Sequence, residues 1–155
     1  MALISQAITG STQNRPEGIK HDIYEVLQDF YHAFNNTDFA LMQENWDNSE
    51  EIAMDNPLGG IKRGWDELKE IYQRIFTGQS KVYVEFYDYS IVEFEGGFCA
   101  IGRERGTLEL KGKKLDLAIR TSRVYKRING VYKQVHHHGS IEDATLLQTY
   151  QDLVR

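Results

Sequence analysis

The chain has 155 residues, of which 41% are hydrophobic, 26% charged and 12% aromatic, and its 18 basic and 23 acidic residues give a net charge of −5. These values fit one globular domain with its own core and exclude collagen-like, coiled-coil and wholly disordered chains. One cysteine excludes an intramolecular disulfide framework, and the negative charge argues against nucleic acid as a partner. Because no apolar run could span a membrane and the N-terminus does not resemble a signal peptide, we expect a cytoplasmic protein with no membrane partner.

The N-terminal part of the chain predicts helices. Residues 1–18 show neither helical nor strand periodicity, and we expect a loosely ordered leader there. Apolar residues at helical spacing then predict a helix over 19–34. Either Asn36 or Thr37 can cap a short second helix that runs from position 38 to about 46.

The rest of the chain predicts mainly strands. Two short strands are expected around the turn signals of residues 50–64, and a third helix over 65–76. From residue 80 the period changes to two, and Asn129-Gly130 gives a strong hairpin signal. A short helix is expected at 143–153, after four long strands at about 81–95, 98–110, 114–128 and 131–138.

This order of elements predicts an α+β domain in which three N-terminal helices pack on the concave face of a curved antiparallel sheet. Strands of this length exceed the usual five or six residues and must bend, so a pocket between helices and sheet is expected. We divide the chain into the leader at 1–18, the folded domain at 19–140 and a C-terminal extension at 141–155 that we expect to be helical.

Three stretches resemble a known superfamily: AFNNTDFALM at 33–42, DNPLGGIKRGWDELKEIY at 55–72 and SRVYKRINGVYKQVHHHGS at 122–140. They are similar to the SnoaL-like and ketosteroid-isomerase-like proteins, also called nuclear transport factor two-like. Within that superfamily the chain looks most like the association domain of calcium/calmodulin-dependent protein kinase. The resemblance implies a cone-shaped α+β barrel with a deep pocket, and a convex sheet face that forms dimers or larger rings.

Two arginines in the middle of predicted strands, Arg103 and Arg123, are candidate ligand-binding residues. A buried arginine is costly unless it is paired, and its planar fork suits a carboxylate or phosphate. The residues alone favour arginines that face outward and pair with acids such as Glu104, whereas the resemblance implies that both point into the pocket. Tyr125 shares the face of Arg123 by strand alternation and joins the candidate set.

The run His136-His137-His138 supplies further candidates. In a regular strand, His136 and His138 share one face and His137 takes the other, so we name His136 and His138 as candidate catalytic residues. A metal would need a third ligand, and no second cluster in the sequence provides one. The sequence therefore predicts no metal site and no cofactor.

The family's steroid-isomerase mechanism does not fit these residues. Alignment of the chain to the ketosteroid isomerases puts Phe30 where that mechanism needs a tyrosine. The same alignment puts Asn56 where the mechanism needs an aspartate base. Tyr31 and Asp55 could substitute only with a register shift of one. Asp55 stays a candidate catalytic carboxylate, with turn formation as the alternative.

Aromatic side chains complete the candidate set. Tyr31 and Trp46 are candidate ligand contacts, although core packing is the default for the tryptophan. Tyr83, Tyr87 and Tyr89 share one face of a regular strand, which we interpret as a subunit interface, so we expect a homodimer or larger homo-oligomer.

Two functions are open at this point. The first is a small-molecule-binding domain, with a carboxylate among the candidate ligands, that catalyses isomerase- or cyclase-type proton transfer if it is an enzyme. The second is a non-enzymatic oligomerisation module like the kinase association domain.

Overall fold

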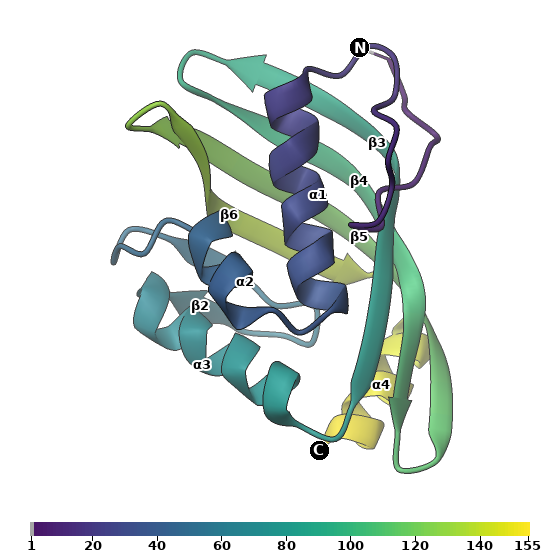
Figure 1. The fold of residues 1–155 in the computed structure, drawn as a ribbon. Coiled ribbons are helices and arrows are strands. Elements are labelled where there is room, and N and C mark those ends of the chain that lie inside the picture. Colours follow the sequence, from purple (N-terminus) through teal and green to yellow (C-terminus); the bar gives the residue numbers. More distant parts are fainter. Residues whose placement is uncertain (1) are drawn as a thin grey trace.

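The computed structural model describes residues 2–155, which form four helices and one six-stranded sheet (Figure 1). The helices are α1 (His21–Asn35), α2 (Phe39–Asn45), α3 (Gly64–Thr77) and α4 (Ala144–Val154). The strands are β1 (Ala53–Asp55), β2 (Ile61–Arg63), β3 (Lys81–Phe94), β4 (Gly97–Leu110), β5 (Lys113–Ile128) and β6 (Val131–Ile141). Within the described residues no helix is both long and apolar enough to cross a membrane.

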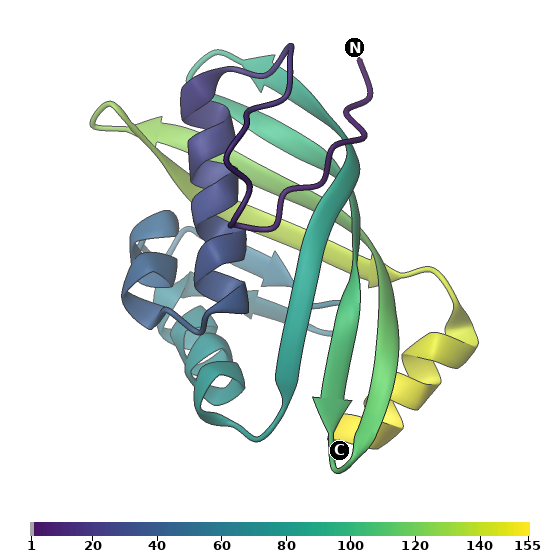
Figure 2. The same cartoon turned by 45° about the vertical axis from the view of Figure 1, so that its right-hand side comes forward.

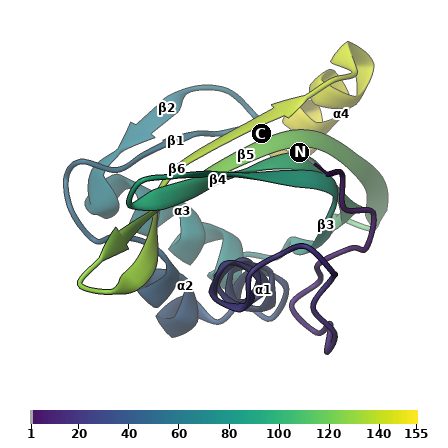
Figure 3. The same cartoon turned by 90° about the horizontal axis from the view of Figure 1, so that it is seen from above.

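The sheet has the order β2-β1-β6-β5-β4-β3 and is curved but not closed (Figure 3). The four long strands form the expected antiparallel meander. The two short strands extend this sheet, because β1 pairs parallel with β6 and antiparallel with β2. Helices α1, α2 and α3 lie on the concave side, which confirms the predicted α+β class.

Helix α1 covers the centre of the sheet because its apolar positions fall on one side. Ile23, Leu27 and Phe30 are buried on that side, whereas Asp22 and Glu25 are exposed, as an amphipathic helix requires. At its C-terminal end, Asn35 accepts a hydrogen bond from the Val84 backbone N–H at 2.9 Å and donates to the Val84 carbonyl at 2.8 Å. This amide fixes the helix against β3.

Two irregularities change which face the strand residues take. The register between β3 and β4 shifts between Tyr87 and Ser90, and the register between β5 and β6 shifts between Val124 and Tyr125. The first shift turns Tyr89 into the core, where it is fully buried, while the Tyr83 side chain is 44% exposed. The predicted tyrosine stripe on one face is therefore wrong.

The first residues are more ordered than a loose leader. Ile4 and Ile8 form bridges with Tyr89 and Phe86 of β3, so the N-terminal segment runs beside that edge strand (Figure 2). The Ile8 side chain is fully buried. The segment thus covers a sheet edge that would otherwise expose unpaired backbone groups.

Candidate functional site

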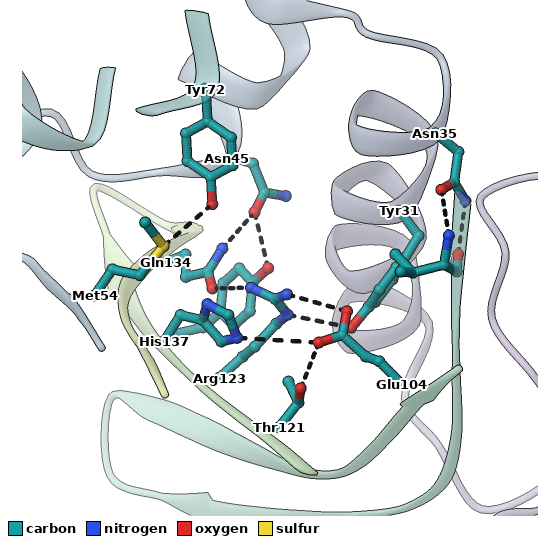
Figure 4. A network of polar contacts seen from close by, with 12 residues as sticks. Tyr31, Asn35, Asn45, Met54, Tyr72, Glu104, Thr121, Arg123, Gln134 and His137 are labelled. Carbon is teal, nitrogen blue, oxygen red and sulfur yellow. Dashed lines mark hydrogen bonds and ion pairs between the residues drawn. The ribbon is translucent and has the colours of Figure 1, made fainter. Parts of the chain in front are cut away.

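Arg123, in the middle of β5, lies at the centre of a buried polar network on the concave face (Figure 4). Its Nε donates to the Tyr31 hydroxyl at 3.2 Å, and its two terminal nitrogens donate to Gln134 at 2.9 Å and Glu104 at 3.4 Å. The guanidinium carbon also lies 3.6 Å from the centre of the Phe30 ring. Each nitrogen of this cation is therefore hydrogen-bonded within the protein.

Glu104 is the acidic partner in this network. Its side chain is 6% exposed and that of Arg123 is 2% exposed, so the ion pair is shielded from water. The Thr121 hydroxyl donates to the second carboxylate oxygen of Glu104. Sequence reasoning named Glu104 only as an acidic partner for arginines that face outward.

The structure puts Arg103 on the outer face, which corrects its predicted place in the pocket. Its side chain is 43% exposed and pairs with Asp88 at 3.3 Å and with Glu142 at 2.7 Å. Adjacent strand residues face opposite sides, so an inward Glu104 requires an outward Arg103. Arg105 also faces outward and pairs with Glu85.

The network continues behind Arg123 into the core. The Gln134 amide nitrogen and the Tyr125 hydroxyl donate to the same Asn45 oxygen, at 3.2 and 2.8 Å. Asn45 in turn donates to the Val26 carbonyl of α1 at 2.8 Å. These bonds connect two strands with two helices and hold the Arg123 partners in place.

Burial changes the ionisation of these groups. Burial raises the pKa of Tyr31 and Tyr125, opposed by the positive charge of Arg123. Burial acts to lower the pKa of Arg123, but the phenolate that Tyr31 forms only at high pH and the Glu104 carboxylate outweigh it and keep that pKa above its ordinary value. The tyrosines are therefore neutral and the arginine is charged at neutral pH.

A cavity of about 410 Å³ opens beside the Arg123–Glu104 pair. Its wall is mostly apolar, and its polar groups include Glu104, Arg123 and His137. Tyr150 and Val154 of α4 line it as well, and a 2.9 Å hydrogen bond from Gln151 to the Leu58 carbonyl ties α4 to the loop between β1 and β2. The C-terminal extension is therefore helical and forms part of the cavity wall.

His137 faces this cavity, whereas the residues named as candidates from the sequence were His136 and His138. Within residues 2–155 neither of its ring nitrogens has a hydrogen-bond partner, and its Nε2 lies 4.0 Å from Glu104. Burial, with the charge of Arg123 adding to it, lowers the pKa of His137 well below its ordinary value. The imidazole is therefore neutral and able both to donate and to accept a hydrogen bond.

The extra residue that turns His137 inward is Val135. Tyr125 pairs with Gln134 and Val124 pairs with His136, so Val135 has no partner on β5 and forms a β-bulge. Gln134 and His137 consequently share the inner face. No residue type in this stretch marks the bulge, so the sequence pattern could not have revealed it.

The remaining predicted site residues lie away from the cavity. His136 and His138 are on the outer face, where His138 Nδ1 lies 2.8 Å from Asp55 Oδ2. Tyr31 and Trp46 are buried in the core and do not line the cavity. Tyr31 is a hydrogen-bond partner of Arg123, whereas the Trp46 ring packs 6.3 Å from that of Tyr72.

Comparison with known proteins identifies the family. The model of the SnoaL-like domain matches residues 23–144. The match spans most of the chain, which therefore belongs to the SnoaL-like domain family. Comparison with curated proteins finds no match.

Solved structures with the same fold include three of similar size. A candidate calcium/calmodulin-dependent protein kinase II association domain from Xanthomonas campestris has a TM-score of 0.70 at 14% identity, covering 83% of this chain and 91% of its own. A nuclear transport factor 2-like superfamily protein from Salmonella enterica serovar Typhimurium has a TM-score of 0.70 at 22% identity, covering 79% and 90%. A candidate dehydratase of the same superfamily from Streptomyces avermitilis has a TM-score of 0.70 at 17% identity, covering 79% and 95%. At these identities the likeness establishes the fold, and function must be argued from the site.

Proposed function

We propose that the protein binds a neutral, largely apolar small molecule in the cavity, with one carbonyl or hydroxyl group of the ligand hydrogen-bonded to His137. The observation that carries this proposal is the buried imidazole, whose two nitrogens have no partner in the described residues. A buried polar group without a partner is costly, and a ligand oxygen would satisfy it. The apolar wall suits the remainder of such a ligand.

The charges in the cavity favour a neutral ligand over the carboxylate expected from the sequence. Arg123 is already paired with Glu104 and hydrogen-bonded to Tyr31 and Gln134. A ligand carboxylate would compete with Glu104 and place two negative charges in one buried site, which is unfavourable. A ketone or alcohol carries no such cost.

The enzymatic form of this proposal is proton transfer on a small carbonyl compound, as in isomerases and cyclases. Glu104 and His137 are polar side chains of the cavity wall that lie beside Arg123, and we assign the proton transfer to them. Asp55, His136 and His138 do not line the cavity and are not assigned to this reaction.

A matched pair of probes tests the choice of ligand. Thermal-shift titrations with 2-acetylnaphthalene and 2-naphthoate compare a ketone and a carboxylate on the same ring system. We expect the ketone to raise the Tm and the carboxylate to have little effect, and we expect His137→Leu to remove the ketone response. A stronger response to the carboxylate, or an unchanged ketone response in the variant, would contradict the proposal.

A second candidate function is association with further copies of the chain through the outer sheet face. On that face Val92 of β3 pairs with Cys99 of β4, and Ile101 lies two residues further along β4, where it pairs with Ser122 of β5. The Val92 and Ile101 side chains are 40% and 41% exposed. Neighbouring apolar side chains on one face favour a protein interface.

Light scattering during size-exclusion chromatography tests this candidate. We expect a dimer or larger species that Ile101→Lys dissociates. Val131→Lys is the matched control. Val131 is 56% exposed in the β5–β6 hairpin and is not part of the Val92–Ile101 surface. A monomer at micromolar concentration would exclude the interface.

A further inference from the structure

Three side chains that the cavity does not use meet on the outer face where β1 and β6 pair. These strands run parallel, with Ala53 beside His136 and Asp55 beside His138. Side chains two residues apart on a strand share a face, so both histidines and the aspartate point the same way. One nitrogen or oxygen atom of each of Asp55, His136 and His138 lies within 4.8 Å of those of the other two.

The hydrogen bond that His136 makes leaves the lone pair of its other ring nitrogen free. The His136 Nδ1 lies 3.0 Å from the Ala53 carbonyl oxygen. Since a carbonyl can only accept a hydrogen bond, Nδ1 carries the proton and the Nε2 lone pair is free. A ring nitrogen that donates to a backbone carbonyl while the other nitrogen is free is the arrangement that orients histidine ligands in metal sites.

We propose that Asp55, His136 and His138 bind a divalent transition-metal ion, with Zn²⁺ the ion that the donor set suits. Two imidazoles and one carboxylate are common ligands of zinc, and the partly exposed site leaves further positions to water. The sequence predicted no metal because a third ligand was missing. The pairing of β1 with β6 supplies it in Asp55.

The geometry requires a small adjustment for an ion to bind. Ligand atoms about 2.0–2.2 Å from one ion lie about 3–4 Å from one another. His138 Nδ1 lies 2.8 Å from Asp55 Oδ2 and donates a hydrogen bond to it, so its proton must move to Nε2 or to solvent before Nδ1 can bind an ion. The third atom must approach by about 1 Å. The His138 side chain is 55% exposed and can rotate without disturbing the core.

A bound ion would join β1 to β6 directly behind the cavity. Met54 and His137 alternate with the proposed ligands on the same strands and line the cavity on the opposite face. Strand β1 has three residues, so a metal cross-link would add a strong constraint to a short pairing. Metal binding should therefore raise the Tm as well as give a direct binding signal.

Calorimetric titration of the full chain without an affinity tag tests the site, with Zn²⁺ as ligand and Co²⁺ as a spectroscopic probe. We expect saturable binding at one ion per chain, visible Co²⁺ absorption bands and a higher Tm with Zn²⁺. Asp55→Asn and His136→Gln should each weaken binding by about tenfold or more, since each loses or impairs one ligand.

His21→Gln is the matched control. His21 and Glu25 form an exposed histidine–carboxylate pair at 3.0 Å on α1, which offers two ligands and no third. This variant should bind Zn²⁺ like the unmodified chain. The proposal is wrong if the unmodified chain shows no saturable binding, or if Asp55→Asn binds with unchanged affinity and the histidine run alone captures the ion.

Discussion

Replacing Glu104 with glutamine tests how much the buried ion pair contributes to stability. The substitution keeps the size of the side chain and an oxygen that can accept from Thr121, but it removes the charge opposite Arg123. The guanidinium would then be buried without a counter-ion. We expect the free energy of unfolding to fall markedly.

The magnitude follows from the burial of both partners. Breaking a buried ion pair by removing one charge costs about 3–5 kcal/mol. Arg123 would keep its hydrogen bonds to Tyr31 and Gln134 and its place over the Phe30 ring, so we expect the lower end of that range. For a chain of this length, about 3 kcal/mol corresponds to a fall in Tm of about 6–12 °C.

Urea unfolding followed by fluorescence of Trp46 and Trp65 provides the assay. The midpoint should fall while the slope m stays constant, because the surface exposed on unfolding is unchanged. The double variant Glu104→Leu with Arg123→Met removes both charges and should cost less than the single Arg123→Met, which leaves the carboxylate unpaired. A cost below about 1 kcal/mol for Glu104→Gln, or additive single costs, would refute this account of the network.

Three further features are tested by substitution. Gly106→Ala should destabilise the fold by about 3 kcal/mol in urea unfolding, because a Cβ there would lie 1.8 Å from the Tyr83 carbonyl oxygen. Ile8→Ala should cost about 2–5 kcal/mol, whereas Leu3→Ala, at a side chain 74% exposed, should be neutral; equal effects would show that the N-terminal segment is not packed as described. Tyr150→Ala should weaken binding of 2-acetylnaphthalene in a titration, since Tyr150 lines the cavity; unchanged affinity would exclude α4 from the site.

The elements of the fold could be predicted because their patterns are local. The amphipathic helices and the Asn129-Gly130 hairpin follow from residue spacing and turn chemistry alone, and they appear at the expected positions. The parallel pairing of β1 with β6 joins segments about 80 residues apart in the chain. Three-residue strands carry too little pattern to predict such a partner.

Only part of the candidate site could be predicted from the sequence, and the limit has a physical cause. Strand alternation says which residues share a face but does not say which face points inward. Arg103 and Arg123 were therefore both expected to face inward, whereas the structure has Arg123 and Glu104 inside and Arg103 outside. The bulges cause the other differences, because one unpaired residue reverses the face of Tyr89 relative to Tyr87, and that of His137 relative to Gln134, without any distinctive residue type.

The bulge at Val135 also lets two sets of chemical groups occupy one strand independently. His137 faces the interior, whereas His136 and His138 face the exterior, so substitutions of the outer histidines can alter the surface without changing the composition of the cavity wall. A regular strand of the same length would have the opposite effect. If Val135 were paired and Gln134 stayed inside, His137 would turn outward and its two neighbours would turn toward Arg123, so one unpaired residue determines the interior and exterior chemistry of the strand.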